Sequence, residues 1–135
     1  FSIFFSSVYL VFMKKFVIGD IHGGLKALLQ VLKKINCDKN DTLIFLGDFV
    51  DGWSESPAVL DFLIELQKKQ QCIFIRGNHD ELLLDWLLGN NEKFDEKLWF
   101  QHGGEATVLS YKNLFKISSK LLFRRKQQIV SSCWI

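Results

Sequence analysis

The sequence has little proline, cysteine or histidine: its 135 residues include one proline, three cysteines and three histidines. The single proline and an apolar content of 48% argue against disorder and are typical of one globular domain with a buried core. Cys37, Cys72 and Cys133 share no metal-ligand spacing. Their odd number and scattered positions indicate unpaired thiols in a reducing compartment, so we expect a cytoplasmic protein.

Acidic residues are missing from the last part of the chain. Residues 1–111 hold all fifteen acidic and eleven of the seventeen basic residues, a net charge of −4, whereas residues 112–135 hold the other six basic residues, a net charge of +6. A basic tail can bind nucleic acid or an acidic membrane surface. We prefer the simpler interpretation of an amphipathic or disordered end, because no motif supports a nucleic-acid binder.

The chain does not begin with methionine, and residues 1–12 are apolar. This segment is too short to span a bilayer as a helix, which needs about 20 residues. It also lacks the basic start and small-residue cleavage site of a secretory signal. Because Met13 is followed by two lysines, as at an ordinary translation start, we interpret residues 1–12 as an extension without a role in the fold. The alternative is a membrane-surface anchor; we expect no membrane span.

Short apolar segments alternate with helical patterns from residue 15 onward. Strands are predicted over 15–18, 43–46 and 72–75. Apolar residues at helical spacing predict helices over about 25–36, 57–69, 78–88, 95–100 and 105–111. Ser56 is the predicted N-cap of the second helix, with Pro57 at its first position. This order predicts an α/β fold of βαβ units with right-handed crossovers and a mainly parallel sheet.

A glycine and at least one possible metal ligand follow each predicted strand. The three sites are Gly19-Asp20-Ile21-His22-Gly23, Gly47-Asp48-Phe49-Val50-Asp51-Gly52 and Gly77-Asn78-His79-Asp80. Ligands of such sheets bind beyond the carboxyl ends of the strands, which is where all three sites fall. We therefore expect their side chains to meet in one pocket.

The ligand types at these sites suit a pair of metal ions. Asp20 and His22 lie two residues apart, and an extended backbone would point both side chains toward one ion. Asp48 has two carboxylate oxygens and can bridge two ions, and Asn78 offers an amide oxygen. This mixed set suits Mn, Fe, Zn or Mg. Two such ions, about 3.5–4 Å apart, would clamp a phosphoryl group and generate hydroxide at neutral pH.

Two further residues have the chemistry of a proton donor and its support. His79 is not needed as a ligand and can protonate the leaving oxygen. Asp51 can hold the His79 imidazole in one tautomer and keep it cationic.

Each site residue also has a structural alternative when it is taken alone. Asp20 and Asn78 can cap helices, Asp51 can be a turn residue, Asp80 can be a first-turn acid, and His102 can end a helix. Three strand-end sites that lie 28 and 30 residues apart are harder to explain separately. Jointly they favour the metal site.

These segments resemble a known family. GDIHG at 19–23, GDFVDG at 47–52 and GNHD at 77–80 are similar to the three N-terminal motifs of the calcineurin-like metallophosphoesterases, in order and at the family's spacing. The resemblance is strongest to the bacterial and phage serine/threonine protein phosphatases, with the symmetrical diadenosine tetraphosphatases nearby. Residues 98–107 are also similar to that group, and the whole resemblance covers about 16–111.

The resemblance implies a fold in which two β-sheets pack between layers of helices, so this chain would hold the N-terminal half of a β-sandwich flanked by helices. It implies hydrolysis of a phosphate ester by in-line attack of metal-bound hydroxide. The phosphorylated substrate could be a protein, a nucleotide or a small molecule. The residues implied are the metal ligands Asp20, His22, Asp48 (bridging) and Asn78, the general acid His79, and Asp51, which orients it.

Phosphate binding departs from the family pattern. The protein phosphatases have an arginine after the second aspartate of the second motif, where this chain has Gly52 followed by Trp53. Other groups must therefore bind the phosphate, and protein-phosphatase activity is less certain. Arg76 can contact the substrate, although an ion pair explains it equally well.

The second metal site is predicted to be incomplete, because the family needs two further histidines from its C-terminal half. With His22 and His79 assigned, His102 is the remaining histidine, and it cannot take either role. We expect a C-terminally truncated or out-of-frame chain with an extension (1–12), a domain (13–111) and a divergent basic tail (112–135). The alternative function is an inactive fragment that binds one metal at most or serves as an interaction module. A missing half-sandwich would leave apolar sheet surface exposed and lower the solubility.

Overall fold

The computed structural model describes residues 13–89 and 94–114. The predicted extension (1–12) and residues 115–135 of the predicted basic tail lie outside the described residues. The elements in chain order are β1 (Lys15–Ile18), α1 (Leu25–Ile35), β2 (Thr42–Phe45), α2 (Ser56–Leu66), β3 (Gln71–Phe74), α3 (Asn78–Leu88), α4 (Glu96–Trp99), the π-helical turn η1 (Phe100–Gly104) and α5 (Glu105–Leu114). The three predicted strands agree with the structure to within one residue.

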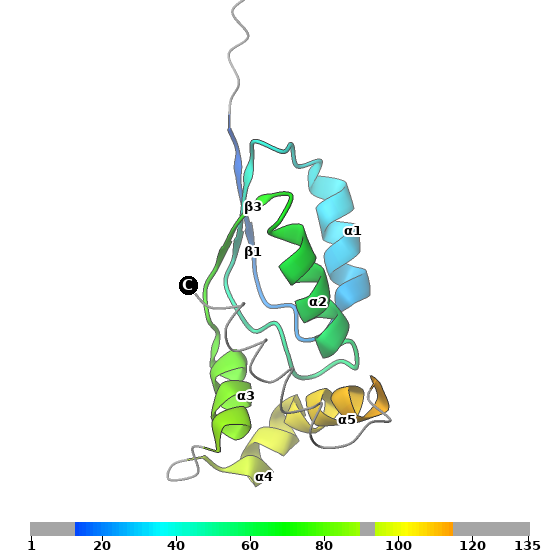
Figure 1. The fold of residues 1–135 in the computed structure, drawn as a ribbon, viewed down its shortest axis with the longest axis vertical. Helices are drawn as coiled ribbons and strands as arrows, with labels where there is room; N and C mark the ends of the chain where they lie inside the picture. Colours follow the sequence, from blue (N-terminus) through cyan, green and yellow to red (C-terminus); the bar gives the residue numbers. More distant parts are fainter. Residues whose placement is uncertain (1–12, 90–93, 115–135) are drawn as a thin grey trace, which may run out of the picture.

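The strands form a parallel sheet in the order β1–β2–β3. Ile18 pairs with Phe45, and Phe45 pairs with Phe74, so the three strands end level with one another. Figure 1 shows α1 and α2 on one side of the sheet, and α3, α4 and α5 beyond the carboxyl ends of the strands. The predicted α/β fold with a parallel sheet is confirmed, and its level strand ends bring the three glycine-containing loops to one edge.

The core lies between the sheet and the helices α1 and α2. Strand alternation turns Ile18, Leu43 and Phe45 to this side, where they form one buried cluster with Leu28 of α1 and Leu60 of α2. Full burial of such a side chain stabilises a fold by about 1.5–3 kcal/mol. The core therefore fixes the strands whose ends carry the candidate site.

The opposite face of the sheet is apolar but exposed. Val17, Leu46, Ile73 and Ile75 expose between 46% and 62% of their surface, whereas α1 and α2 cover the other face (Figure 1). An exposed apolar sheet surface is what the sequence predicts for half of a sandwich, and the low solubility stays a prediction. Among the described residues, no helix combines the length and the apolar character that crossing a membrane requires.

The start of α2 differs from the prediction. Ser56 is the first helical residue, and Glu55 precedes the helix. The Ser56 side chain is fully buried, and its Oγ lies 3.1 Å from Oγ1 of Thr107. The prediction of Ser56 as N-cap is wrong, because its hydroxyl makes a tertiary hydrogen bond instead.

Candidate active site

The loop after β1 turns around a carbonyl group of the loop after β2. The backbone N–H groups of Ile21 and His22 donate to the carbonyl oxygen of Asp48 over 3.0 and 2.8 Å. His22 is in the left-handed region, with a φ of 48°. The prediction that an extended backbone aligns Asp20 with His22 is therefore wrong, because both amides converge on one acceptor and bend the chain into a turn.

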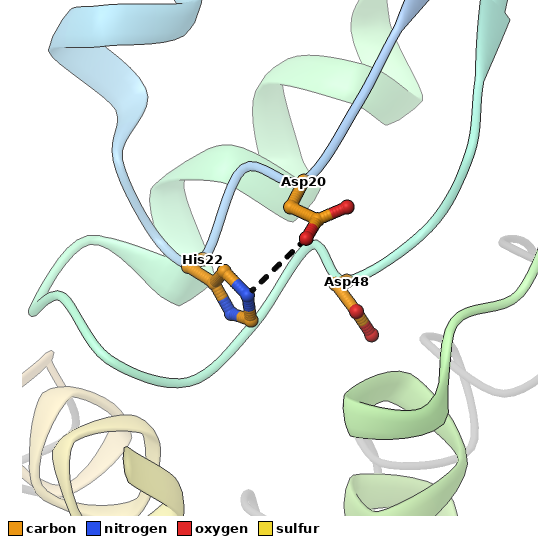
Figure 2. A group of neighbouring side chains, drawn as sticks. All are labelled: Asp20, His22 and Asp48. Carbon is orange, nitrogen blue, oxygen red and sulfur yellow. Dashed lines mark ion pairs between the residues drawn. The ribbon is translucent and has the colours of Figure 1, made fainter. Parts of the chain in front are cut away.

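Asp20, His22 and Asp48 nevertheless come together. Each offers one ligand atom, and these atoms all lie within 4.8 Å of one another. Oδ2 of Asp20 is 3.8 Å from Nε2 of His22. Figure 2 shows these two side chains facing each other on the loop after β1, with Asp48 beside them on the loop after β2. Asp20 is exposed and the other two are half-buried, so a cation can reach the cluster from solvent.

The hydrogen bonding of His22 leaves its Nε2 available as a ligand. Nδ1 lies 3.1 Å from the carbonyl oxygen of Val50. A carbonyl oxygen only accepts, so Nδ1 carries a hydrogen, and in the neutral imidazole the lone pair is then on Nε2. Metal-binding histidines usually donate their second ring nitrogen to a carbonyl or carboxylate in this way. His22 thus has the tautomer that a metal ligand needs.

Asn78 is the exposed first residue of α3, and both of its neighbours contact Asp48. Gly77 has no room for a side chain, because a Cβ there would overlap the carboxylate and the backbone N of Asp48. The N–H of His79 donates to Oδ1 of Asp48 over 2.9 Å. The alternative of Asn78 as N-cap is wrong, since Gly77 precedes the helix. The metal-ligand role of Asn78 stays a prediction.

Asp51 and His79 form a close pair next to this cluster. Nδ1 of His79 donates to Oδ2 of Asp51 over 2.8 Å, and the carboxylate is fully buried. The His79 ring meets the His22 ring edge to face, with ring centroids 4.8 Å apart. A buried carboxylate fixes both the tautomer and the orientation of an imidazole. The geometry is that of an oriented proton donor, and the catalytic roles themselves stay predictions.

The family model described as Calcineurin-like phosphoesterase matches residues 13–132. The chain belongs to this family. The match extends past residue 111, and the predicted division of the chain at that point stays a prediction.

Relatives of this calcineurin-like chain carry two kinds of name. The chain is 33% identical over 113 residues to the asymmetrical bis(5'-nucleosyl)-tetraphosphatase PrpE of Oceanobacillus iheyensis, which covers 77% of this chain and 43% of the relative. It is 29% identical over 103 residues to serine/threonine-protein phosphatase 1 of Salmonella typhimurium, covering 69% and 45%. It is 40% identical over 73 residues to the symmetrical bis(5'-nucleosyl)-tetraphosphatase of Proteus mirabilis, covering 53% and 26%. The chain thus spans less than half the length of these relatives.

Backbone strain is concentrated at the candidate site of this family member. His22, Asp48 and Asp51 have φ values of 48°, 51° and 70°. Residues other than glycine seldom adopt this left-handed region. Each such residue costs about 1–3 kcal/mol, and such residues are typical of functional sites. Within the described residues, the remaining non-glycine case is Asn36, which ends α1.

Sequence reasoning recognised Asp80 only as a first-turn acid. Its carboxylate is buried and accepts from the N–H groups of Gly77, Asp48 and Phe49 over 2.8–2.9 Å. Burial raises the pKa of Asp80 to about 6, although these three hydrogen bonds act in the opposite direction. Asp80 therefore ties the loop after β2 to the start of α3. No sequence signal separated it from an ordinary helix-start acid.

Sequence reasoning also missed Trp99 and Thr107. Nε1 of Trp99 donates to Oδ2 of Asp51 over 2.7 Å, and Oγ1 of Thr107 donates to Oδ1 over 2.8 Å. The resemblance covered their segment but gave neither residue a role. A buried tryptophan needs a partner for its N–H, but the sequence alone does not show that Trp99 is buried.

Three other residues were candidates for the site: His102, Arg76 and Trp53. His102 is exposed at the kink within η1, with a φ of −93°. Nη1 of Arg76 is 3.8 Å from Oε1 of Glu81, in keeping with the ion-pair alternative. Trp53, which follows the glycine at the family's arginine position, is 70% exposed.

Proposed function

We propose that this chain carries the metal-binding and proton-donating part of a phosphoesterase site. One observation carries the proposal: the ligand atoms of Asp20, His22 and Asp48 lie within 4.8 Å of one another, beside a histidine–aspartate pair whose carboxylate is buried. A cation site next to an oriented proton donor suits the hydrolysis of phosphate esters, in which one group takes up charge and another protonates the leaving oxygen.

The donor set fits a divalent cation. Two carboxylates and a neutral imidazole suit Mn, Fe, Zn or Mg, and the Val50 carbonyl oxygen holds the imidazole in the required tautomer. A bound ion would polarise a phosphoryl oxygen and lower the pKa of a water molecule. Asp48 and Asn78 would hold a second ion, but the family resemblance implies two more histidine ligands that this chain lacks. We therefore expect one tight ion per chain.

His79 is the proposed general acid. Asp51 occupies its Nδ1, which leaves Nε2 to deliver a proton to the leaving oxygen. The edge contact with His22 keeps the ring beside the metal ligands. The buried Asp51 carboxylate accepts the Nδ1 hydrogen and so fixes the orientation of the ring.

Hydrolysis assays with Mn²⁺ test this proposal. His79→Asn should slow the hydrolysis of phenyl phosphate at least about 100-fold, because its leaving group needs a proton, and should affect p-nitrophenyl phosphate less. Asp48→Asn should abolish both reactions by removing the shared ligand. His102→Asn and Asp61→Asn, which change the same residue types outside the cluster, are the matched controls. The proposal fails if all four variants hydrolyse the esters alike.

A second candidate is an inactive fragment that binds one ion and does not hydrolyse phosphate esters. It is favoured by the exposed position of His102, the third histidine of the chain. Calorimetric titration with Mn²⁺ separates the two candidates when it is combined with the assay above. One tight site without hydrolysis supports the fragment, whereas two tight sites per chain contradict the incomplete second site.

The proposed substrate is a phosphate ester of a nucleotide, a protein or a small molecule. The names of the relatives favour the first two. A panel of a bis(5'-nucleosyl) tetraphosphate, a phosphoserine peptide and glycerol phosphate ranks the three classes by kcat/KM. Cys37 and Cys72 are free, which suits a reducing compartment such as the cytoplasm.

A further inference from the structure

We propose that Trp99 and Thr107 are positioning residues that fix the Asp51 carboxylate and thereby the orientation of His79. Both come from the segment after α3, far along the chain from the motif that contains Asp51. The inference rests on the proposed function only for the chemical role of His79. The positioning itself concerns hydrogen bonds within this chain and is tested without turnover.

Three donors surround the Asp51 carboxylate. Oδ2 accepts from Nδ1 of His79 over 2.8 Å and from Nε1 of Trp99 over 2.7 Å, and Oδ1 accepts from Oγ1 of Thr107 over 2.8 Å. Asp51, Trp99 and Thr107 are at most 1% exposed, so water cannot replace either donor. Because both oxygens are engaged, the carboxylate cannot rotate about its Cβ–Cγ bond without losing hydrogen bonds. The position of Oδ2, on which His79 depends, is therefore set by Trp99 and Thr107.

Thr107 holds the backbone of Asp51 as well as its side chain. Oγ1 of Thr107 accepts from the N–H of Asp51 over 2.8 Å. Its single hydrogen is donated to Oδ1, so the 3.1 Å contact with Ser56 must have Ser56 as donor. Thr107 thus links α5, α2 and the loop after β2 through one hydroxyl.

Two adjacent glycines allow the segment to approach the loop. Gly103 has a φ of 100°, and its carbonyl oxygen accepts from the N–H of Gly52 over 3.2 Å. A Cβ on Gly103 would meet the Gly52 backbone, and one on Gly104 would overlap the Trp99 indole. The glycine pair that interrupts the helix therefore brings Trp99 on one side and Thr107 on the other into contact with the same carboxylate.

The indole N–H of Trp99 is separable from its packing role. The Trp99 ring lies in an aromatic cluster with Trp86, Phe94 and Phe100, at centroid distances of 5.4–5.6 Å. A phenylalanine at position 99 would keep most of this packing and lose the hydrogen bond to Asp51. Trp99→Phe and Thr107→Val are accordingly the test variants, since each removes one donor and retains an apolar side chain.

The experiment is nuclear magnetic resonance of the metal-free chain with labelled histidine and tryptophan nitrogens. The wild-type chain should show a downfield, slowly exchanging Nδ1–H proton on His79 and a protected indole proton on Trp99. In both variants the His79 ring signals should shift. In Trp99→Phe the Nδ1–H proton should exchange about tenfold faster, as expected for one lost hydrogen bond. In Thr107→Val it should exchange at least as fast, because the hydroxyl makes three hydrogen bonds.

Three control variants separate positioning from general loss of packing. Thr107→Ser keeps the hydroxyl and should restore the wild-type His79 signals. Trp86→Phe removes an indole N–H that donates to Glu96, within the same aromatic cluster, and should leave His79 unchanged. Ser110→Ala removes a buried hydroxyl of α5 that donates to the carbonyl oxygen of Thr107, and should also leave the ring signals unchanged.

Unchanged His79 signals in both test variants would overturn the proposal. If a variant does not fold, the wild-type chain decides, because a Trp99 indole proton that exchanges as fast as that of the exposed Trp53 would contradict the buried hydrogen bond. A chain without hydrolytic activity refutes the proposed function and leaves this test intact. An active chain with unperturbed His79 signals refutes the positioning role alone.

Discussion

The candidate metal cluster of Asp20, His22 and Asp48 is adjacent to the Asp51–His79 pair, yet the two groups are held in opposite ways. Asp20 and His22 lie at or near the surface, and their Oδ2 and Nε2 atoms face each other across 3.8 Å. Asp51 is fully buried, and both of its oxygens accept hydrogen bonds from side chains. The first group keeps lone pairs available for an external cation, whereas the second has its lone pairs engaged within the protein. The cluster should therefore respond to metal, and the pair to changes in the fold.

The largest effect is expected from Asp51→Ala. It leaves three donors without an acceptor, on His79, Trp99 and Thr107, and each buried unpaired group costs about 1–3 kcal/mol. We expect the free energy of unfolding to fall by about 3 kcal/mol or more. Urea denaturation with an unchanged m-value measures this loss. A loss below about 1 kcal/mol would show that the Asp51–His79 pair is not held more firmly by the fold than the candidate metal cluster.

Addition of a metal ion should stabilise the chain by binding to the cluster of Asp20, His22 and Asp48. At a Mn²⁺ concentration of a hundred times Kd, the free energy of unfolding should rise by about 2.7 kcal/mol, and a chelator should reverse the gain. Asp48→Asn should lose the effect, whereas His79→Asn should keep it. Equal stabilisation of the wild type and Asp48→Asn would place the ion elsewhere.

A third effect concerns Asp80, which joins the loops around the cluster. The two oxygens of Asp80 together accept from three backbone N–H groups, so Asp80→Asn puts an N–H₂ group against at least one of these donors. The variant should lose about 1–3 kcal/mol of unfolding free energy. Denaturation of the variant and the wild type in urea measures the difference. Asp61→Asn on the exposed surface of α2 is the control and should cost less than about 0.5 kcal/mol.

The same variant tests a pH dependence. Burial raises the pKa of Asp80 to about 6 from 3.8. Between these values the folded chain holds a proton that the unfolded chain has lost, so the contribution of Asp80 to stability falls as the pH rises from about 4 to 6. The difference in unfolding free energy between the wild type and Asp80→Asn should shrink over this range. A difference that grows with pH would contradict the raised pKa.

The smallest effect on stability is expected at the exposed ligand. Asp20→Asn should change the unfolding free energy by less than about 0.5 kcal/mol, as is usual for surface substitutions. It should nevertheless weaken Mn²⁺ binding at least about tenfold, since removing even an outer-sphere partner has that effect. Denaturation and calorimetric titration of one sample measure both. If Asp20→Asn lowered the stability and left the Mn²⁺ affinity unchanged, Asp20 would support the fold and not the ion, contrary to this prediction.

The elements that sequence predicted well depend on local patterns. The apolar segments at 15–18, 43–46 and 72–75 fall within one residue of the observed strands, and the parallel sheet follows from their alternation with helices. The loops that contain Asp20, His22 and Asp48 begin where those strands end. A local pattern was therefore enough to bring these residues to one edge of the sheet.

The parts that sequence did not predict depend on contacts between distant segments. Asp51 lies 48 residues before Trp99 and 56 before Thr107, and no periodicity links them. The prediction of an extended backbone at His22 was wrong for the same reason. The His22 N–H donates to the Asp48 carbonyl oxygen on another loop, and this contact bends the chain. At such positions the direction of a side chain depends on how closely two loops approach each other. The residue types of one loop do not reveal that distance.

The left-handed backbone at His22, Asp48 and Asp51 has an evolutionary consequence. Glycine adopts such a conformation without steric penalty, so selection for thermal robustness alone would favour glycine at His22 and Asp48, whereas the three hydrogen bonds that the Asp51 carboxylate accepts offset the strain there. A lineage that no longer needed the chemistry would be free to drift in that direction. The imidazole of His22 and the carboxylate of Asp48 therefore carry a conformational cost of the kind that is typical of functional sites.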